Sequence, residues 1–151
     1  MNHEEVKIYI ASDYRGNSLK NEIIPYVDAC HAFLNIEDLG NNSDSPDDYN
    51  DAASSVAKKI LNEKDAFGIL ICGSAHGVCI AANRYKGIRA CNCATVESAR
   101  LAREHDNANI LCLSAELTSP TDAEEIVKTF FHTKFAENER RSRRIIRLDE
   151  E

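Results

Sequence analysis

Residues 67–77 read FGILICGSAHG, and this stretch decides the class of fold. The first six residues form an uninterrupted apolar run, which is typical of a strand that is buried on both faces of a sheet. The next five, GSAHG, are mostly small and predict a tight turn that leads into a short helix over residues 78–83. A buried strand that passes through a tight turn into a helix is the repeating unit of α/β proteins.

The same unit recurs along the chain. Apolar runs predict further strands at residues 6–11, 33–39, 88–94 and 110–113. Helical patterns predict helices over residues 18–29, 47–61, 95–104 and 122–131. Pro25 is expected to kink or break the first helix, because proline lacks the amide hydrogen that a helix needs. We therefore predict an α/β fold: a single-domain, Rossmann-like three-layer sandwich in which helices cover both faces of a five-stranded parallel sheet.

Composition and charge exclude several classes of protein. The chain has 151 residues, of which 43% are hydrophobic and 28% charged, as expected for one globular domain over residues 1–151. Its net charge of -7 argues against a nucleic-acid-binding domain. No apolar run approaches the roughly 18 residues of a membrane span. Residues 1–5 have no apolar core, so no secretory signal is expected, and the cytoplasm is the predicted location.

The sequence contains six cysteines: Cys30, Cys72, Cys79, Cys91, Cys93 and Cys112. Without a secretory signal we expect reduced thiols, most of them packed as small buried hydrophobes. No Cys-x-x-Cys pair occurs, and Cys91 and Cys93 would point to opposite faces of one strand. A metal site is therefore not predicted.

Cys72 is placed for chemistry, because it ends the buried strand and precedes the small-residue turn. Backbone amides in such a turn can hold an oxyanion or a phosphate, and their positive end lowers the pKa of a nearby thiol. A thiolate there could abstract a proton from carbon while the amides stabilise an enediolate oxygen. The turn lacks both the Walker pattern and the dinucleotide fingerprint. An inert core cysteine is the alternative, and the pattern alone leaves both interpretations open.

Two further residues could take part in proton transfer. Asp13 follows the first strand, where an aspartate is either a helix cap or a ligand-contacting carboxylate. His105 lies near the end of a helix, where a capping or surface role competes with acid–base catalysis. Ligands of parallel sheets bind at the carboxyl ends of the strands. We expect Asp13 and His105 to lie with Cys72 at that edge as one constellation.

Residues 137–151 differ in character from the rest of the chain. Five arginines are balanced by five acids in this segment: Arg140, Arg141, Arg143, Arg144 and Arg147 against Glu137, Glu139, Asp149, Glu150 and Glu151. A solvated helix face is one interpretation, and a nucleic-acid-binding tail is a weaker one because the acids cancel the field. The third is a helix that faces a partner and delivers guanidinium groups to an anion.

Taken together in order, the motifs identify a family that the chain resembles. They are Ser12-Asp13 with Arg15-Gly16, ILICGS with Gly77, IAANR, GIRA, AREHDNANIL and RRSRRI, from about Val6 to Ile145. The chain resembles the ribose-5-phosphate isomerase B family, which also includes galactose-6-phosphate isomerase subunits. The resemblance implies an aldose–ketose isomerase that needs no cofactor, acts on a sugar phosphate, and forms a homodimer or a dimer of dimers. From the acidic net charge and the lack of a long apolar run, we expect no nucleic-acid or membrane partner.

The resemblance also implies roles for individual residues. Cys72 falls where the family has its general base, and His105 where it has the group that opens the sugar ring. Asp13 and Ser74 complete the implied catalytic set. The implied substrate-binding residues are Ser12, Tyr14, Gly73, Ala75, His76, Gly77, Asp106, Arg140 and Arg144. In this family the two arginines come from the neighbouring subunit and bind the substrate phosphate, which agrees with the partner-facing interpretation of residues 137–151.

Several positions depart from the family pattern. Tyr14 stands where the family has histidine, Glu116 where it has a phosphate-facing arginine, and Ala52 where it has tyrosine. Asp106 replaces an asparagine and Ala75 a glycine, while Arg141 replaces a histidine. We expect Glu116 to oppose a bound phosphate, because like charges in a partly buried site repel. These changes leave open an isomerase for another sugar, phosphorylated or free, and a non-catalytic relative that binds sugar phosphates.

Overall fold

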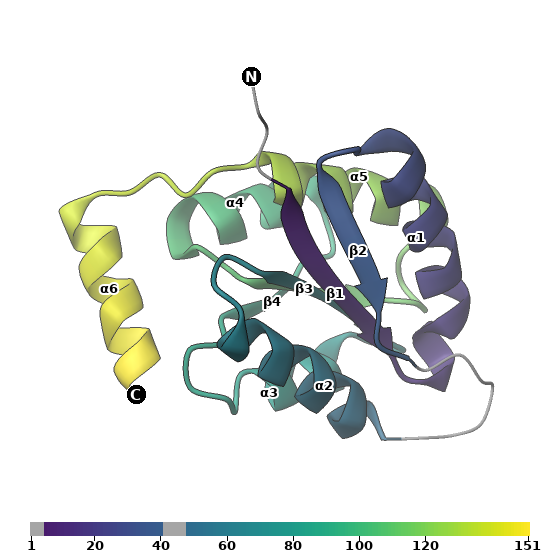
Figure 1. Cartoon of the computed structure of the whole chain (residues 1–151), viewed down its shortest axis with the longest axis horizontal. Helices are drawn as coiled ribbons and strands as arrows, with labels where there is room; N and C mark the ends of the chain where they lie inside the picture. Colours follow the sequence, from purple (N-terminus) through teal and green to yellow (C-terminus); the bar gives the residue numbers. More distant parts are fainter. Residues whose placement is uncertain (1–4, 41–47) are drawn as a thin grey trace.

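A five-stranded parallel sheet forms the centre of the computed structural model, which describes residues 5–40 and 48–151. The strands are β1 (Val6–Ser12), β2 (Leu34–Asp38), β3 (Phe67–Cys72), β4 (Ala90–Asn92) and β5 (Ile110–Ser114), in the spatial order β2-β1-β3-β5-β4. Every pair is parallel, so all five strands end at the same edge of the sheet (Figure 1). This arrangement confirms the predicted class of fold.

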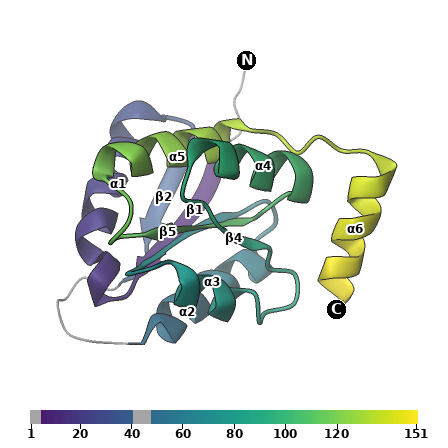
Figure 2. The same ribbon diagram turned by 180° about the vertical axis from the view of Figure 1, so that it is seen from behind.

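Helices cover both faces of this sheet (Figures 1 and 2). They are the short 3-10 helix η1 (Tyr14–Gly16), α1 (Asn17–Cys30), α2 (Tyr49–Asn62), α3 (His76–Ala82), α4 (Val96–Asp106), α5 (Pro120–His132) and α6 (Glu139–Glu150). Helices α1, α4 and α5 pack on one face, and α2 and α3 pack on the other. Each face has its own apolar core, and the central strand β3 contributes alternate side chains to the two.

The sequence places most elements within two residues of their observed bounds, and the differences have local causes. Helix α1 runs through Pro25, which is exposed and leaves its missing hydrogen bond on the solvent side. Helix α3 begins at His76 because Ala75, with a φ of 69°, takes the left-handed conformation and starts the helix early. Strand β4 is shorter than the predicted residues 88–94, and it lies at the edge of the sheet, where it pairs only with β5. Residue 47, the predicted start of α2, lies outside the described residues.

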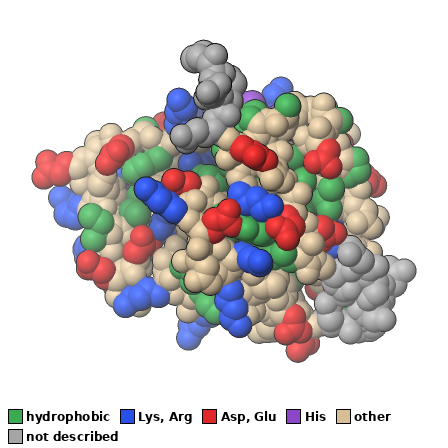
Figure 3. Space-filling model, viewed as in Figure 1, with side chains coloured by type: hydrophobic (Ala, Val, Ile, Leu, Met, Phe, Trp, Pro, Cys, Tyr) green, Lys and Arg blue, Asp and Glu red, His purple; other side chains and the backbone are tan. Residues whose placement is uncertain are grey.

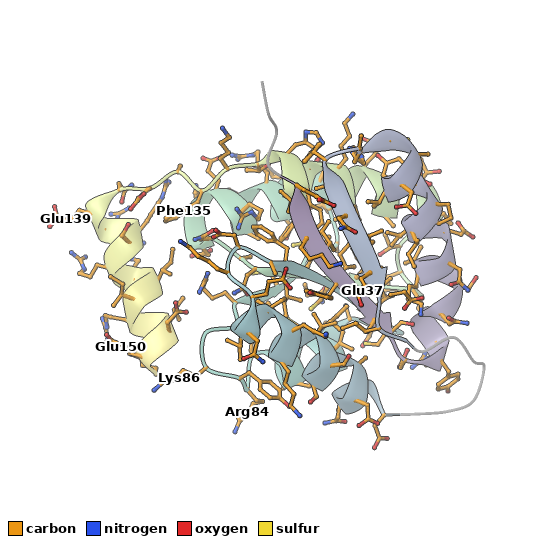
Figure 4. All side chains as sticks on the ribbon, viewed as in Figure 1. Glu37, Arg84, Lys86, Phe135, Glu139 and Glu150 are labelled. Carbon is orange, nitrogen blue, oxygen red and sulfur yellow. The ribbon has the colours of Figure 1, made fainter. Side chains whose placement is uncertain are left out.

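Helix α6 stands apart from the rest of the molecule. None of its residues is buried, and Figure 4, which labels Glu139 and Glu150 near its two ends, shows it beside the body rather than within it. Its main polar attachment is Arg89, whose Nη1 lies 2.7 and 2.9 Å from the two carboxylate oxygens of Asp149. Ile146 and Leu148 of this helix are exposed. The helix therefore presents apolar and cationic side chains outward.

The charge distribution on the surface and the lengths of the helices bear on two classes of protein that the sequence argued against, nucleic-acid-binding domains and membrane-spanning proteins. Figure 3 shows acidic and basic side chains interspersed over one face of the molecule. Within the described residues, no helix combines the length and the apolar character needed to cross a membrane.

Two histidines at the ends of α1 and α5, His31 and His132, predict that the stability of the protein depends on pH. His31 is buried, its Nδ1 lies 3.2 Å from Nε2 of His132, and its Nε2 lies 3.3 Å from the Tyr26 hydroxyl. Burial lowers the pKa of His31, and the neighbouring charges of His132 and Lys128 lower it further. The folded state therefore binds fewer protons than the unfolded state, in which the pKa is about 6.5.

We expect the free energy of unfolding to be fully retained above about pH 6.5 and to fall as the pH drops from there through the lowered pKa of His31. The slope contributed by this one group approaches about 1.4 kcal/mol per pH unit. Urea unfolding of the wild type and of His31→Phe between pH 7.5 and 5 measures it, and the variant should lose this part of the slope. An unchanged slope in His31→Phe would assign the acid sensitivity to other groups.

Candidate active site

The predicted chemistry gathers where β1 and β3 lie side by side. After β1 the chain turns to α1 on one face of the sheet, and after β3 it turns to α3 on the other face. Such a topological switch point is where open parallel sheets bind ligands. Ser12 pairs with Ile71 in register, so the loops that carry Asp13 and Cys72 leave the sheet side by side.

Asp13 is both a helix cap and a resident of this switch point. Its Oδ1 accepts a hydrogen bond of 3.0 Å from the Gly16 amide, and its own amide donates to the Ile71 carbonyl at 3.2 Å. Asp13 is buried, as is Ser12 before it. The loop after β1 is therefore fixed on the end of β3, and the capping interpretation of Asp13 is correct without removing the carboxylate from the site.

The turn after β3 is held by the loop after β5. The Cys72 carbonyl accepts from the Ala115 amide at 2.9 Å. The Gly73 carbonyl accepts from the Ser114 hydroxyl at 2.6 Å and from the Glu116 amide at 3.0 Å. Cys72 itself is buried at the end of its strand. Three neighbouring loops are thus tied together around the thiol.

The remaining turn residues lead into α3. The Ser74 hydroxyl accepts from the His76 amide at 3.3 Å, and Nδ1 of His76 lies 3.3 Å from the side-chain nitrogen of Asn92, at the end of β4. A Cβ atom on Gly77 would meet the Tyr49 ring at 2.6 Å, so this ring lies directly against the turn. Tyr49 was not among the predicted site residues, although Asp48-Tyr49 keeps the first two residues of an Asp-Tyr-Pro-x-Tyr pattern in the family that the chain resembles.

Arg15 is a second residue that the sequence interpretation missed. Its guanidinium forms an ion pair with the Glu116 carboxylate, and a Cβ atom on Gly73 would overlap the guanidinium group. Glu116 is therefore paired with a cation, which reduces the repulsion expected between its carboxylate and a bound phosphate. The cation comes from the loop after β1 and the anion from the loop after β5, and no local pattern joins two loops so far apart in the sequence.

His105 does not lie beside Cys72 within one chain, which corrects the expectation that they share an edge. Helix α4 begins after the carboxyl end of β4 and returns the chain to the opposite edge, where β5 starts. Its 11 residues span roughly 16 Å. His105 lies in the last turn of this helix, with its side chain 43% exposed and its Nε2 3.6 Å from a Glu104 carboxylate oxygen.

The other predicted residues that follow His105 lie at this second edge as well. Asp106 and Arg144 line the same pocket of about 340 Å³, together with Arg147, Leu148 and Glu151. Arg140 lies one turn before Arg144 on the exposed face of α6. The structure therefore sorts the predicted site into two groups at opposite edges of the sheet. Ser12, Asp13, Tyr14 and residues 72–77 form one group, and His105, Asp106, Arg140 and Arg144 form the other.

Cys79, in α3, is a thiol whose environment favours ionisation. A hydrogen bond from Cys112 lowers the pKa of Cys79 to about 7 against the opposing effect of burial. Burial raises the pKa of the neighbouring thiols, to about 12 for Cys91 and about 11 for Cys93. Cys79 lies in helix α3 and not at the end of a strand. Its thiol is 3.4 Å from the Ala90 carbonyl oxygen. It therefore serves as an internal comparison for Cys72.

The geometry defines a class of protein, an α/β protein with a buried thiol and a carboxylate at the switch point of a parallel sheet. A family model described as Ribose/Galactose Isomerase matches residues 8–148, and the chain belongs to this family. The resemblance read from the motifs is thereby confirmed.

Relatives and solved structures agree with this assignment. A probable ribose-5-phosphate isomerase B of Mycoplasma genitalium is 42% identical over 148 residues, covering 95% of this chain and 96% of the relative. A ribose 5-phosphate isomerase structure from Thermotoga maritima matches with a TM-score of 0.91 and 44% identity, over 97% of this chain and 99% of the other. The Mycoplasma genitalium enzyme with bound ribulose-5-phosphate matches with a TM-score of 0.91 and 41% identity, over 98% and 97% of the two chains.

The close contact between the loop after β1 and the end of β3 predicts a loss of stability in Gly16→Ala. The added Cβ would lie 2.5 Å from the Ile71 carbonyl oxygen, which is backbone of the central strand and cannot move aside cheaply. We expect the free energy of unfolding to fall by about 1–3 kcal/mol, measured by chemical denaturation. Ser18→Ala, at an exposed position two residues later, should change it by less than about 0.5 kcal/mol. Equal stability of the two variants would contradict the contact.

Proposed function

We propose that this protein is an aldose–ketose isomerase that interconverts ribose 5-phosphate and ribulose 5-phosphate without a cofactor. The observation that carries the proposal is the buried Cys72 thiol at the carboxyl end of β3, beside the Asp13 loop at the switch point. Family membership supports it, as does the match to a relative that was solved with bound ribulose-5-phosphate.

The reaction moves one proton between neighbouring carbons. The Cys72 thiolate removes the proton from carbon 2 of the open-chain aldose, and the electron pair forms the double bond of an enediolate as negative charge moves to the carbon 1 oxygen. Amides of the turn over residues 73–77 stabilise that oxygen. A proton then passes from the oxygen on carbon 2 to the oxygen on carbon 1, and the thiol returns its proton to carbon 1, which gives the ketose. No external oxidant or reductant is needed, because carbon 1 is reduced as carbon 2 is oxidised.

The two separated groups of residues favour a site shared by two copies of the chain. A two-fold dimer that brings the second group of one chain to the first group of its partner repeats that contact, so two complete sites form at once. In each, His105 opens the sugar ring and Arg140 and Arg144 bind the phosphate. The exposed apolar side chains of α6, Ile146 and Leu148, give residues 137–151 a surface to pack on the partner.

Ala52 favours a second candidate, an isomerase of the same kind for a larger sugar phosphate. Beside Ala52, where the family pattern has tyrosine, lies a pocket of about 150 Å³ that Ser12, Gly40 and Ser55 also line. Turnover on a panel of five- and six-carbon aldose phosphates and free aldoses separates the two candidates. Absence of turnover on the whole panel would favour a non-catalytic sugar-phosphate-binding protein.

The six free cysteines fit a reducing compartment such as the cytoplasm.

Cys72→Ser is expected to lower kcat for ribose 5-phosphate by about 10²–10⁴-fold, because a serine hydroxyl is scarcely ionised at neutral pH. KM should change by less than about threefold, since the hydroxyl occupies nearly the same space. Cys79→Ser is the matched control and should keep most of the activity. Loss of turnover in Cys79→Ser with near-normal turnover in Cys72→Ser would move the general base to Cys79.

Mixing two inactive variants tests the shared site. Cys72→Ser and His105→Asn should each be inactive as homodimers, while the mixed dimer retains one site with both residues intact. We expect about half of the wild-type activity per mixed dimer, measured after refolding the two differently tagged chains together and purifying the mixed species. An inactive mixed dimer would show that each site is built from a single chain. Arg144→Ala in place of His105→Asn should give the same recovery.

A further inference from the structure

The ion pair of Arg15 and Glu116 spans the turn that follows Cys72. It joins the loop after β1 to the loop after β5, and both side chains are about half exposed, 46% for Arg15 and 51% for Glu116. The guanidinium group occupies the space beside the Gly73 backbone where a side chain would otherwise be. A permanent cation is therefore fixed one residue from the proposed catalytic thiol, with part of its surface open to solvent.

Arg15 is also the one accessible cation that the described residues place in the loops and first helical turns at the carboxyl edge of the sheet. Of the lysines and arginines in the described part of the chain, only Arg15 and Lys20 belong to the loops and first helical turns that follow the strands. Lys20 is fully buried and its Nζ lies 2.9 Å from Asp38, so it faces no ligand. Arg15 is the accessible cation of a region that also carries Asp13 and Glu116.

The chemistry of the pair leaves donors for a ligand. A guanidinium has five N–H donors, of which a carboxylate can engage two. The carboxylate holds the planar group in one orientation while the remaining donors stay available to oxyanions. Glu116 in this arrangement is a positioning residue for Arg15, and the backbone bond from its amide to the Gly73 carbonyl keeps it in place.

We propose that Arg15, oriented by Glu116, binds the anionic group of the substrate and is a specificity-determining residue of this site. The inference rests on the proposed function for the identity of the substrate, a sugar phosphate. It gives each site an arginine from the chain that supplies Cys72, in addition to the arginines that α6 of the second chain supplies. Loss of one charge-assisted hydrogen bond weakens binding by about ten- to a hundredfold.

Steady-state kinetics of Arg15→Gln with ribose 5-phosphate test the assignment. We expect KM to rise about ten- to a hundredfold, with kcat within about threefold of the wild type. The inhibition constant of inorganic phosphate, used as a competitive probe, should rise in parallel. Arg15→Lys should recover part of the affinity, because it restores the charge without the planar fork. Glu116→Gln should raise KM less than Arg15→Gln does, because it frees the guanidinium without removing it.

The control is Arg84→Gln, an exposed arginine after α3 that Figure 4 shows at the periphery, which should leave every constant unchanged. Unchanged KM and phosphate inhibition in Arg15→Gln, with or without lower stability, would reduce the pair to a structural link and overturn the inference. A wild type that turns over no sugar phosphate would instead refute the proposed function. Calorimetric titration of inorganic phosphate into the wild type and Arg15→Gln then still decides whether Arg15 binds an anion.

Discussion

The parallel pairing of β1 with β3 is the constraint on which the rest of the structure depends. It brings Ser12 level with Ile71 and so places the loops after these two strands in contact. The contact is close enough that Gly16 leaves no room for a Cβ beside the Ile71 carbonyl. Asp13 and Cys72 are neighbours because of this backbone fit, and their side chains do not themselves create it. Chemistry at this edge can therefore vary through exposed residues such as Tyr14, Arg15 and Glu116 while the backbone remains fixed.

The same topology divides the proposed site. In a parallel sheet each strand ends at one edge, and the helix that follows returns the chain to the other edge. A residue in a turn after a strand and a residue in the last turn of a helix therefore lie at opposite edges of the sheet, separated by about the length of the strands. Cys72 and His105 stand in this relation, and helix α6 extends the second group. A reaction that uses both residues requires two chains, and a two-fold arrangement satisfies this requirement twice with one kind of contact.

The sequence predicted the features that depend on local pattern, and it missed those that depend on distant contacts. The apolar run at residues 67–72 predicted β3 to the residue, and the five strand–helix units predicted the sheet and its layers. Pro25 does not break α1, because helix packing outweighs one lost hydrogen bond at an exposed position. The separation of His105 from Cys72 follows from the topology. Cys72 ends a strand at one edge of the sheet, and His105 lies in the last turn of a helix that returns the chain to the other edge. The ion pair of Arg15 with Glu116 could not be predicted, because only the folded sheet brings these loops together.

The substitution of Glu116 for the arginine of the family pattern changes the electrostatics less than composition alone implies. Glu116 pairs with Arg15, so the two residues together add no net charge beside the turn. With arginine at position 116, as in the family pattern, the region around the turn after β3 would carry more positive charge. With Glu116 it carries less, although the Arg15 guanidinium remains. Under the proposed function, a dianionic substrate would then depend more strongly on the arginines of α6, which include Arg141 as well as Arg140 and Arg144. If those arginines come from the second chain, substrate binding and dimer formation stabilise each other, because any ligand that contacts both chains favours the assembled state by mass action.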